Sequence, residues 1–338
     1  MSDDVFEASL TEEMLRRIRG SSVISGKAGA MSFYSPLDRS FESLKGWMTS
    51  PMFKAERVWD LLHGAYDIHQ HSGPSPHTDR LFDELDLAIH GCYIGLGGIV
   101  FKEQYGPSTR STRIVQHAVN DWADQHGKKR IEIFGGVCLN YAVGGLNPDA
   151  LVASYRSGGK YLWLPSVDAN HHRAAVNQGV GQGIDLIDDK GEVNEATHQI
   201  LELVAETDMV LGVGHQSTKE RFAVVKEAVR LGIQRIEILH VNFPPSWLTP
   251  EQCKMLADLG AYISLYAVDE AYWSWDDAMA VYNAVGPERM LIGSDRGHIS
   301  IGHPIDGLRR FIVGFMQSGV PDEHIRLMCR TNAYNLLH

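Results

Sequence analysis

The stretch Tyr66-Asp67-Ile68-His69-Gln70-His71 joins a short apolar run to two histidines, and Ser72-Gly73-Pro74-Ser75 follows it directly. Successive side chains alternate between the two faces of a strand, so we expect His69 and His71 to point the same way. Two imidazoles at one strand end can both reach one metal ion. Surface and core histidines also occur at this spacing, so the rest of the chain must supply the other ligands.

Short β-favouring runs alternate with longer helical patterns from this stretch onward. The strand-like runs cover residues 66–71, 98–103, 130–139, 161–167, 209–215, 235–241, 262–267 and 290–295. The helical patterns cover residues 79–90, 109–126, 148–157, 194–206, 219–231, 250–259, 276–285 and 304–316. Eight strand–helix units over about 250 residues predict an α/β fold, a (β/α)8 TIM barrel. An open doubly wound sheet is the alternative, but no Gly-rich dinucleotide loop follows the first strand.

The chain divides into an N-terminal extension, residues 1–63, and a barrel domain, residues 64–338. The extension is expected to be partly helical, with a capped helix starting near Thr11, a Ser- and Gly-rich loop, and a short helix over residues 55–62. We expect the last residues to form a helix pair packed on the exterior of the barrel.

Composition narrows the class of protein. The formal net charge of -11 argues against nucleic acid and anionic membrane surfaces as partners. No apolar run is long enough to span a bilayer, and the acidic N-terminus does not look like a signal peptide. The four cysteines form no CxxC pair, which favours reduced thiols and a cytoplasmic protein. We expect a small-molecule substrate and leave open a homo-oligomer, with the extension available as a subunit contact.

Functional side chains of a (β/α)8 barrel lie at the C-terminal ends of its strands. Besides His69 and His71, the residues of interest at such ends are Lys102, His215, His240 and Asp295, the last directly after Gly293-Ser294. They come from distant parts of the chain, and only a closed barrel would bring them to one point.

This ordered set resembles the amidohydrolase superfamily of metal-dependent hydrolases over residues 66–338. Thr331-Asn332-Ala333, followed by Leu336-Leu337, also resembles the C-terminal helix of such enzymes. The resemblance implies that His69, His71 and His215 ligate a metal ion. The resemblance also implies that two residues take part directly in catalysis.

Those two residues are Asp295 and His240. By the resemblance, Asp295 touches the metal and takes a proton from the attacking water, while His240 binds the substrate or ligates a second metal. The implied reaction is hydrolysis of a C–N amide, or of an ester or lactone, in a small, partly apolar or aromatic substrate. A divalent cation lowers the pKa of the water bound to it towards about 7, which makes hydroxide available for this reaction at neutral pH. Imidazole and carboxylate ligands favour Zn²⁺, with Mn²⁺, Fe²⁺ and Ni²⁺ as alternatives, as one or two ions.

The end of the fourth strand departs from the pattern of binuclear members. It reads Leu164-Pro165-Ser166, without the lysine or glutamate that bridges two metals. One interpretation is a single metal, as in the branch that contains decarboxylases. The alternative function is therefore a mononuclear decarboxylase or lyase acting on an aromatic or unsaturated carboxylic acid. A non-catalytic metal-binding barrel is a third hypothesis, which Asp295 argues against, because a structural zinc site needs no proton carrier.

Lys102 could instead supply the bridge as a carbamate, from an unusual position after the second strand. A lysine in an apolar strand must be paired, neutral or modified, because a buried ammonium group is costly. Two other hypotheses stay open: an ion pair with Glu103 or Asp67, and a cation that holds a substrate carboxylate or oxyanion.

Five further residues are candidates for substrate binding: His171, His172, Arg296, Trp273 and Trp275. The two histidines lie in a loop after the fourth strand and could equally be exposed. Arg296 could anchor an acidic group or pair with a neighbouring carboxylate. The tryptophans could form an aromatic wall or pack their loop onto the barrel.

Overall fold

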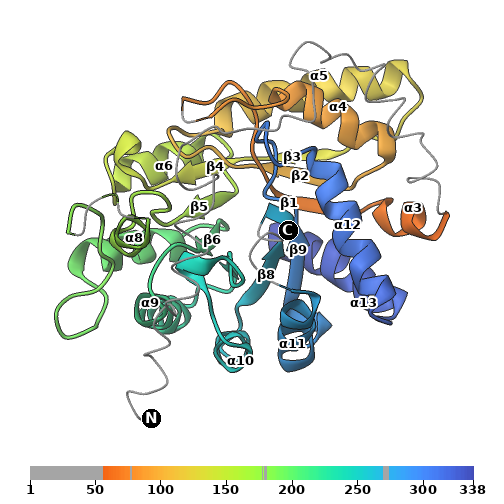
Figure 1. The fold of residues 1–338 in the computed structure, drawn as a ribbon. Coiled ribbons are helices and arrows are strands. Elements are labelled where there is room, and N and C mark those ends of the chain that lie inside the picture. Colours follow the sequence, from red (N-terminus) through yellow and green to blue (C-terminus); the bar gives the residue numbers. More distant parts are fainter. Residues whose placement is uncertain (1–55, 77, 177, 179–180, 269–273) are drawn as a thin grey trace.

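The computed structural model describes residues 56–76, 78–176, 178, 181–268 and 274–338, in which short strands alternate with helices (Figure 1). The strands are β1 (Tyr66–Gln70), β2 (Gly98–Phe101), β3 (Glu132–Phe134), β4 (Gly136–Cys138), β5 (Tyr161–Trp163), β6 (Val210–Val213), β7 (Ile236–Ile238), β8 (Tyr262–Tyr266) and β9 (Met290–Gly293). All pairings between these strands are parallel, in the orders β1-β2-β3 and β4-β5-β6-β7-β8-β9.

These strands make eight barrel units, because β3 and β4 are two parts of the strand predicted over residues 130–139. Gly135 separates the two parts, and its carbonyl oxygen accepts the amide N–H of Lys160 at 2.8 Å. A side chain at Gly136 would collide with the carbonyl of Tyr161, so close strand approach needs glycine there. The predicted (β/α)8 barrel is confirmed.

The barrel closes between its last and first strands. The amide N–H of Asp295, after β9, donates to the carbonyl of His69 at 2.8 Å, and that of His71 donates to the carbonyl of Arg296 at 2.9 Å. The carboxylate of Asp67 accepts the amide N–H of Ser294 at 2.9 Å. A β1 side chain thus completes the hydrogen bonding of this seam.

Helices surround the barrel. They are α3 (Glu56–Leu62), α4 (Glu84–Ile94), α5 (Thr109–Gln125), α6 (Pro148–Arg156), α7 (Asn170–Ala175), α8 (Glu195–Ala205), α9 (Thr218–Arg230), α10 (Pro250–Asp258), α11 (Trp275–Val285), α12 (Pro304–Gln317), α13 (Asp322–Arg326) and α14 (Asn332–Leu337). The longer helices bury apolar side chains, as in α5, where Val115, Val119 and Ala123 recur at four-residue spacing and are buried. None of the helices in the described ranges combines the length and apolarity that a membrane crossing demands.

Helix α4 begins at Glu84, five residues after the predicted start. Asp83 caps it: its side chain accepts the amide N–H of Asp86, whose side chain in turn accepts that of Asp83. The preceding residues pair with the segment after β9 instead, since Leu81 N–H donates to the carbonyl of Gly297 at 3.0 Å. This tertiary pairing removes residues 79–83 from the expected helix.

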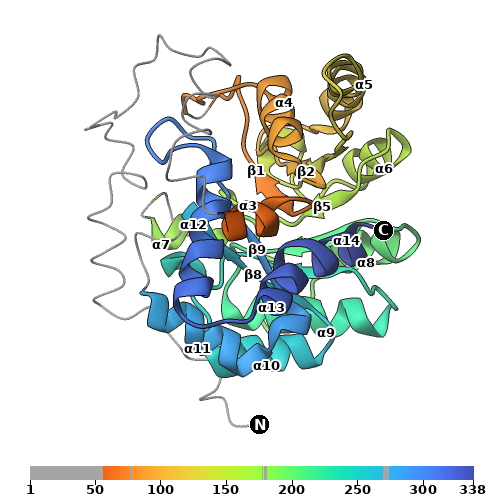
Figure 2. The same cartoon turned by 90° about the vertical axis from the view of Figure 1, so that its right-hand side faces the viewer.

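The first and the last described helices, α3 and α14, pack on the barrel (Figure 2). Helix α3 lies within the predicted extension, yet Leu61 and Leu62 are fully buried and α3 contacts α12. The rest of the extension, including the helix expected near Thr11, lies outside the described residues. Helix α14 was expected on the exterior, but Leu336 and Leu337 join the cluster of side chains inside the barrel, together with Ile68. That expectation was wrong, because α14 closes the interior at the N-terminal end of the strands.

Candidate metal centre

Strand β1 carries the first two histidines into the barrel. Every residue of β1 is buried, and His69 has no exposed surface. The ring centroids of His69 and His71 lie 5.2 Å apart, so the two rings are neighbours, as their spacing predicted. Nδ1 of His71 lies 2.8 Å from the carbonyl oxygen of Lys102, and Nε2 lies 2.9 Å from Oδ1 of Asp295. A backbone carbonyl thus orients His71 with its other nitrogen towards the carboxylate.

Asp295 lies between three imidazoles. Its Oδ1 lies 3.3 Å from Nε2 of His69, and its Oδ2 lies 3.5 Å from Nε2 of His240. Asp295 and His240 also share a rare backbone conformation, with φ of 46° and 56°, and they are the non-glycine residues with positive φ in the described chain. Such strain costs about 1–3 kcal/mol per residue and concentrates at functional sites. The surrounding fold therefore holds these two side chains in place at an energetic cost.

The residues His69, His71 and Asp295 fit a metal ion. One ligand atom from each lies within 4.8 Å of the others, and all three residues are buried. Both ring nitrogens of His69 are buried and lack a hydrogen bond, although Nε2 is close to Asp295. An orphaned buried imidazole is costly unless something binds it. Two nitrogens and one carboxylate oxygen are donors that divalent transition metals accept.

A second group of histidines adjoins the first. Nδ1 of His215 lies 2.9 Å from Nδ1 of His172, and the rings of His215 and His240 lie 4.9 Å apart. Phe243 borders all three rings. The predicted ligand His215 thus lies near the centre but outside the group of three, and its role as a ligand stays a prediction. His172, a candidate for substrate binding, lies among these rings.

Burial sets the charge of the histidines. It lowers the pKa of His69 and His215 well below the ordinary value, lowers that of His71, and brings that of His172 to about 3. Burial acts in the opposite direction on Asp295, but the neighbouring histidines hold the pKa of this carboxyl below its usual range. Neutral imidazoles beside an ionised carboxylate are the protonation states that metal ligation requires.

Lys102 is buried, with 3% of its surface exposed, and its Nζ lies 5.7 Å from the centre of the Trp163 ring. The expected ion pairs with Glu103 or Asp67 are absent from the described part of the chain. The carboxylate of Asp67 instead accepts hydrogen bonds from Ser294 and Gln70. That of Glu103 accepts the amide N–H groups of residues 104 and 105. The ion-pair hypothesis for Lys102 is therefore wrong, and the carbamate stays a prediction.

The end of the fourth barrel strand, β5, offers no bridging ligand. Ser166 follows it, and its hydroxyl accepts a hydrogen bond from Nδ2 of Asn140 at 2.9 Å. This serine is buried in contacts between loops.

Three of the predicted substrate contacts are engaged elsewhere. Nε2 of His171 lies 2.6 Å from the carbonyl oxygen of Pro245. The guanidinium of Arg296 reaches the carbonyl of Ala267 at 3.4 Å and Asp306 at 3.8 Å, the pairing that was its alternative. Trp275 packs on α12, with its ring centroid 5.6 Å from that of Phe311 and 5.5 Å from that of Phe315. Trp273 lies outside the described residues.

Sequence reasoning missed two residues near the centre. The ring of Tyr266, at the end of β8, lies 4.9 Å from that of His69 and 5.0 Å from that of His240. Its position in the last residue of a strand was a usable signal. Arg80 comes from the loop after β1, where no motif marks it, and its charge acts on both His71 and Asp295.

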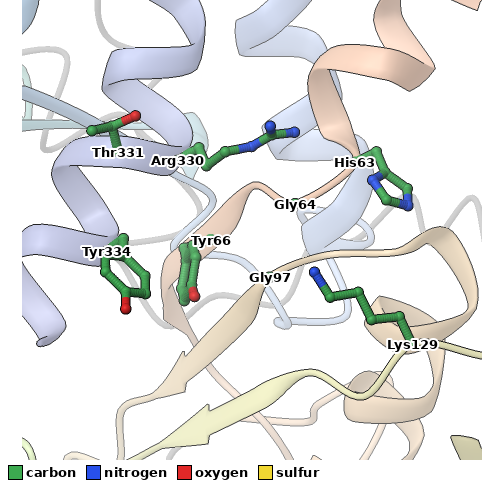
Figure 3. A pocket seen from close by; sticks show the side chains of 8 residues that line it. All are labelled: His63, Gly64, Tyr66, Gly97, Lys129, Arg330, Thr331 and Tyr334. Carbon is green, nitrogen blue, oxygen red and sulfur yellow. The ribbon is translucent and has the colours of Figure 1, made fainter.

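The described cavity lies at the opposite end of the barrel. It measures about 420 Å³, and its lining residues precede strands, begin β1 or belong to the C-terminal helical segment: His63, Gly64, Tyr66, Gly97, Lys129, Arg330, Thr331 and Tyr334 (Figure 3). The active sites of (β/α)8 barrels lie at the other face, where the strands end. We therefore place the candidate site at the histidines and not in this cavity.

Comparison with solved structures shows the same fold. The probable dipeptidase PvdM from Pseudomonas aeruginosa has a TM-score of 0.54 at 13% identity, covering 85% of this chain and 97% of that one. An amidohydrolase from Burkholderia multivorans has a TM-score of 0.51 at 15% identity, covering 81% and 98%. A lactonase from Listeria monocytogenes has a TM-score of 0.50 at 14% identity, covering 82% and 95%. The resemblance to the amidohydrolase superfamily is thus confirmed at the level of the fold.

Comparison of the sequence itself gives a narrower result. No curated protein matches the chain. Residues 64–264, more than half of the chain, match the model of a family of unknown function, DUF6282. The chain therefore belongs to the DUF6282 family, and it has the barrel fold of the amidohydrolases.

Proposed function

We propose that this protein is a metal-dependent hydrolase that cleaves a C–N amide bond, or an ester or lactone, in a small molecule. The observation that carries the proposal is the carboxylate of Asp295, held between the imidazoles of His69, His71 and His240 by a strained backbone. The names given to structures of the same fold, an amidohydrolase, a lactonase and a probable dipeptidase, support hydrolysis as the reaction class.

His69, His71 and Asp295 would hold a divalent cation, and Zn²⁺ suits this donor set best. When bound, such an ion lowers the pKa of a water molecule towards about 7 and polarises a carbonyl group. Asp295 keeps an ionised carboxylate in a buried site, so it can accept a proton from the attacking water and pass it to the leaving group. Nε2 of His240, 3.5 Å from Oδ2 of Asp295, lies where it can donate to an oxyanion that forms beside that carboxylate.

The test is turnover of zinc-reconstituted protein on a panel of amides, esters and lactones, with Asp295→Asn as the key variant. We expect turnover to fall by about 10³-fold or more, because the variant cannot accept the proton. Asp322→Asn is the matched control, since this carboxylate pairs with Arg57 on the surface. Full turnover in Asp295→Asn, or none in the wild-type protein across the panel, would contradict the proposal.

A decarboxylase or lyase with one metal is the second candidate. The group of three potential ligands and the serine at the end of β5 favour a single ion over a bridged pair. Release of carbon dioxide from an aromatic or unsaturated carboxylic acid, without hydrolysis of the panel, would decide for this reaction.

A further inference from the structure

Two cationic side chains lie near the candidate metal centre and form no close ion pair within the described part of the chain. The first is Lys102, which is buried, and whose possible partners Asp67 and Glu103 are engaged by other groups. A buried ammonium group without a counter-charge is costly, so the fold retains it at the expense of stability.

The second is Arg80, whose position the backbone fixes. Arg80 forms an antiparallel bridge with His298. Leu81 N–H donates to the carbonyl of Gly297, which lies two residues after Asp295 in the sequence. Gly297 has no side chain, and one there would collide with the carbonyl of His71. This close approach brings the Arg80 segment against the end of β1. Nε of Arg80 is buried without a hydrogen bond, and its guanidinium makes no ion pair within the described residues.

Both cations come from segments that flank the same histidine. The segment of Arg80 reaches His71 through Gly297, which lies against the carbonyl of His71. The main chain of Lys102 also touches this residue, because its carbonyl oxygen lies 2.8 Å from Nδ1 of His71. The carboxylate of Asp295 attracts Arg80 but lies between three imidazoles, so a ligand anion would add the counter-charge that Lys102 lacks.

We propose that Arg80 and Lys102 form an oxyanion-binding subsite beside the metal centre, so that the substrate of the hydrolase proposed above carries a carboxylate or phosphate group. Hydrolysis of such a substrate rests on the proposed function, whereas binding of the anion at this subsite does not. Arginine offers a fork of donors that matches such a group, and lysine adds a compact charge. The subsite orients the substrate by its charged end and leaves the scissile carbonyl for the metal centre.

The test measures binding and needs no turnover. Zinc-loaded protein is titrated in a calorimeter with benzoate, phenyl phosphate and the neutral benzamide. We expect benzoate or phenyl phosphate to bind at least about tenfold more tightly than benzamide, since charged hydrogen bonds supply the difference. Whichever of the two anions binds better identifies the group. Arg80→Gln and Lys102→Met should each remove most of the preference at unchanged zinc content, while Arg309→Gln, which changes a cation paired with Asp306, should keep it.

Three results would overturn the subsite. Benzamide could bind as tightly as the anions. The preference could persist in the Arg80→Gln/Lys102→Met double variant, which would assign the anion to the metal itself. Lys102→Arg, which keeps the charge but cannot form a carbamate, could lose zinc, which would favour a carbamate. A protein that hydrolyses neutral amides without any anion preference would retain its proposed function and lose only this subsite.

Discussion

The two ends of the barrel differ in how their buried polar groups are paired. At the N-terminal end, Tyr66 and His338 share one carboxylate: the hydroxyl of Tyr66 donates to Glu132 at 2.5 Å, and Nε2 of His338 lies 3.0 Å from the same group. Leu336 and Leu337 of α14 fill the interior beside them. This end shows the packing and hydrogen bonding that stabilise a fold.

The C-terminal end leaves comparable groups unpaired. His69 has two buried nitrogens without hydrogen bonds, Lys102 has no counter-ion in the described chain, and Asp295 and His240 have strained backbones. Each of these features costs stability, and such costs persist where function requires them. The comparison predicts that changes at the C-terminal end weaken binding and activity and can raise stability, whereas changes at the N-terminal end lower stability.

The largest expected effect is on metal affinity. His71→Ala removes one of three ligand atoms, so we expect the affinity for zinc to fall by more than about 100-fold. Competition with a chromogenic chelator measures the affinity, and His126→Ala, at the exposed C-cap position of α5, is the control. Zinc affinity unchanged in His71→Ala would remove the metal centre from this end of the barrel.

A change at the other end should separate stability from binding. Leu336→Ala opens a cavity among fully buried side chains, so the free energy of unfolding should fall by about 2–5 kcal/mol. Zinc affinity should stay within about twofold. Denaturant unfolding measures the first quantity, with the exposed Asn335→Ala on the same helix as the control. A large loss of zinc affinity in Leu336→Ala would show that the two ends are coupled.

The sequence predicted the order of the site well and its surroundings less well. His69, His71 and Asp295 could be brought together from sequence because barrel order fixes which strand ends meet. Arg80 could not, because its position depends on backbone pairing with Gly297 and His298, which leaves no local pattern.

Helix α14 was misplaced, and Trp275 was left with two alternatives, for a related reason. Periodicity identifies the apolar face of a helix but not the surface that this face contacts. Leu336 faces the interior of the barrel, and Trp275 faces α12, where its ring lies against Phe315. A sequence of one protein contains no signal that distinguishes such packing from a place at the mouth of the barrel.

Removal of the unpaired ammonium should stabilise the C-terminal end. In metal-free protein, Lys102→Met keeps the length of the side chain and removes the buried charge, so the free energy of unfolding should rise by about 1–3 kcal/mol. Thermal and denaturant unfolding measure it. A decrease in stability would show that Lys102 has a favourable partner, and the contrast between the two ends would then be weaker.

The smallest expected effect depends on pH and concerns Glu84, at the start of α4. Burial raises the pKa of this carboxyl from 4.5 to about 7, with smaller contributions from Glu103 and Asp83, and its Oε2 has no hydrogen bond. Between pH 4.5 and 7 the unfolded chain releases this proton while the folded chain retains it. The folded state therefore binds more protons, and stability falls as the pH rises through this window.

Glu84→Gln removes this titration. The variant should match the wild-type protein in stability near pH 4 and exceed it by about 1–2 kcal/mol above pH 7, less than the full shift because the side chain is partly exposed. Denaturant unfolding at several pH values measures the difference, and the exposed Glu206→Gln should show no such trend. A difference that does not change with pH would mean that Glu84 is ionised throughout, and its burial would then not belong among the costs of the C-terminal end.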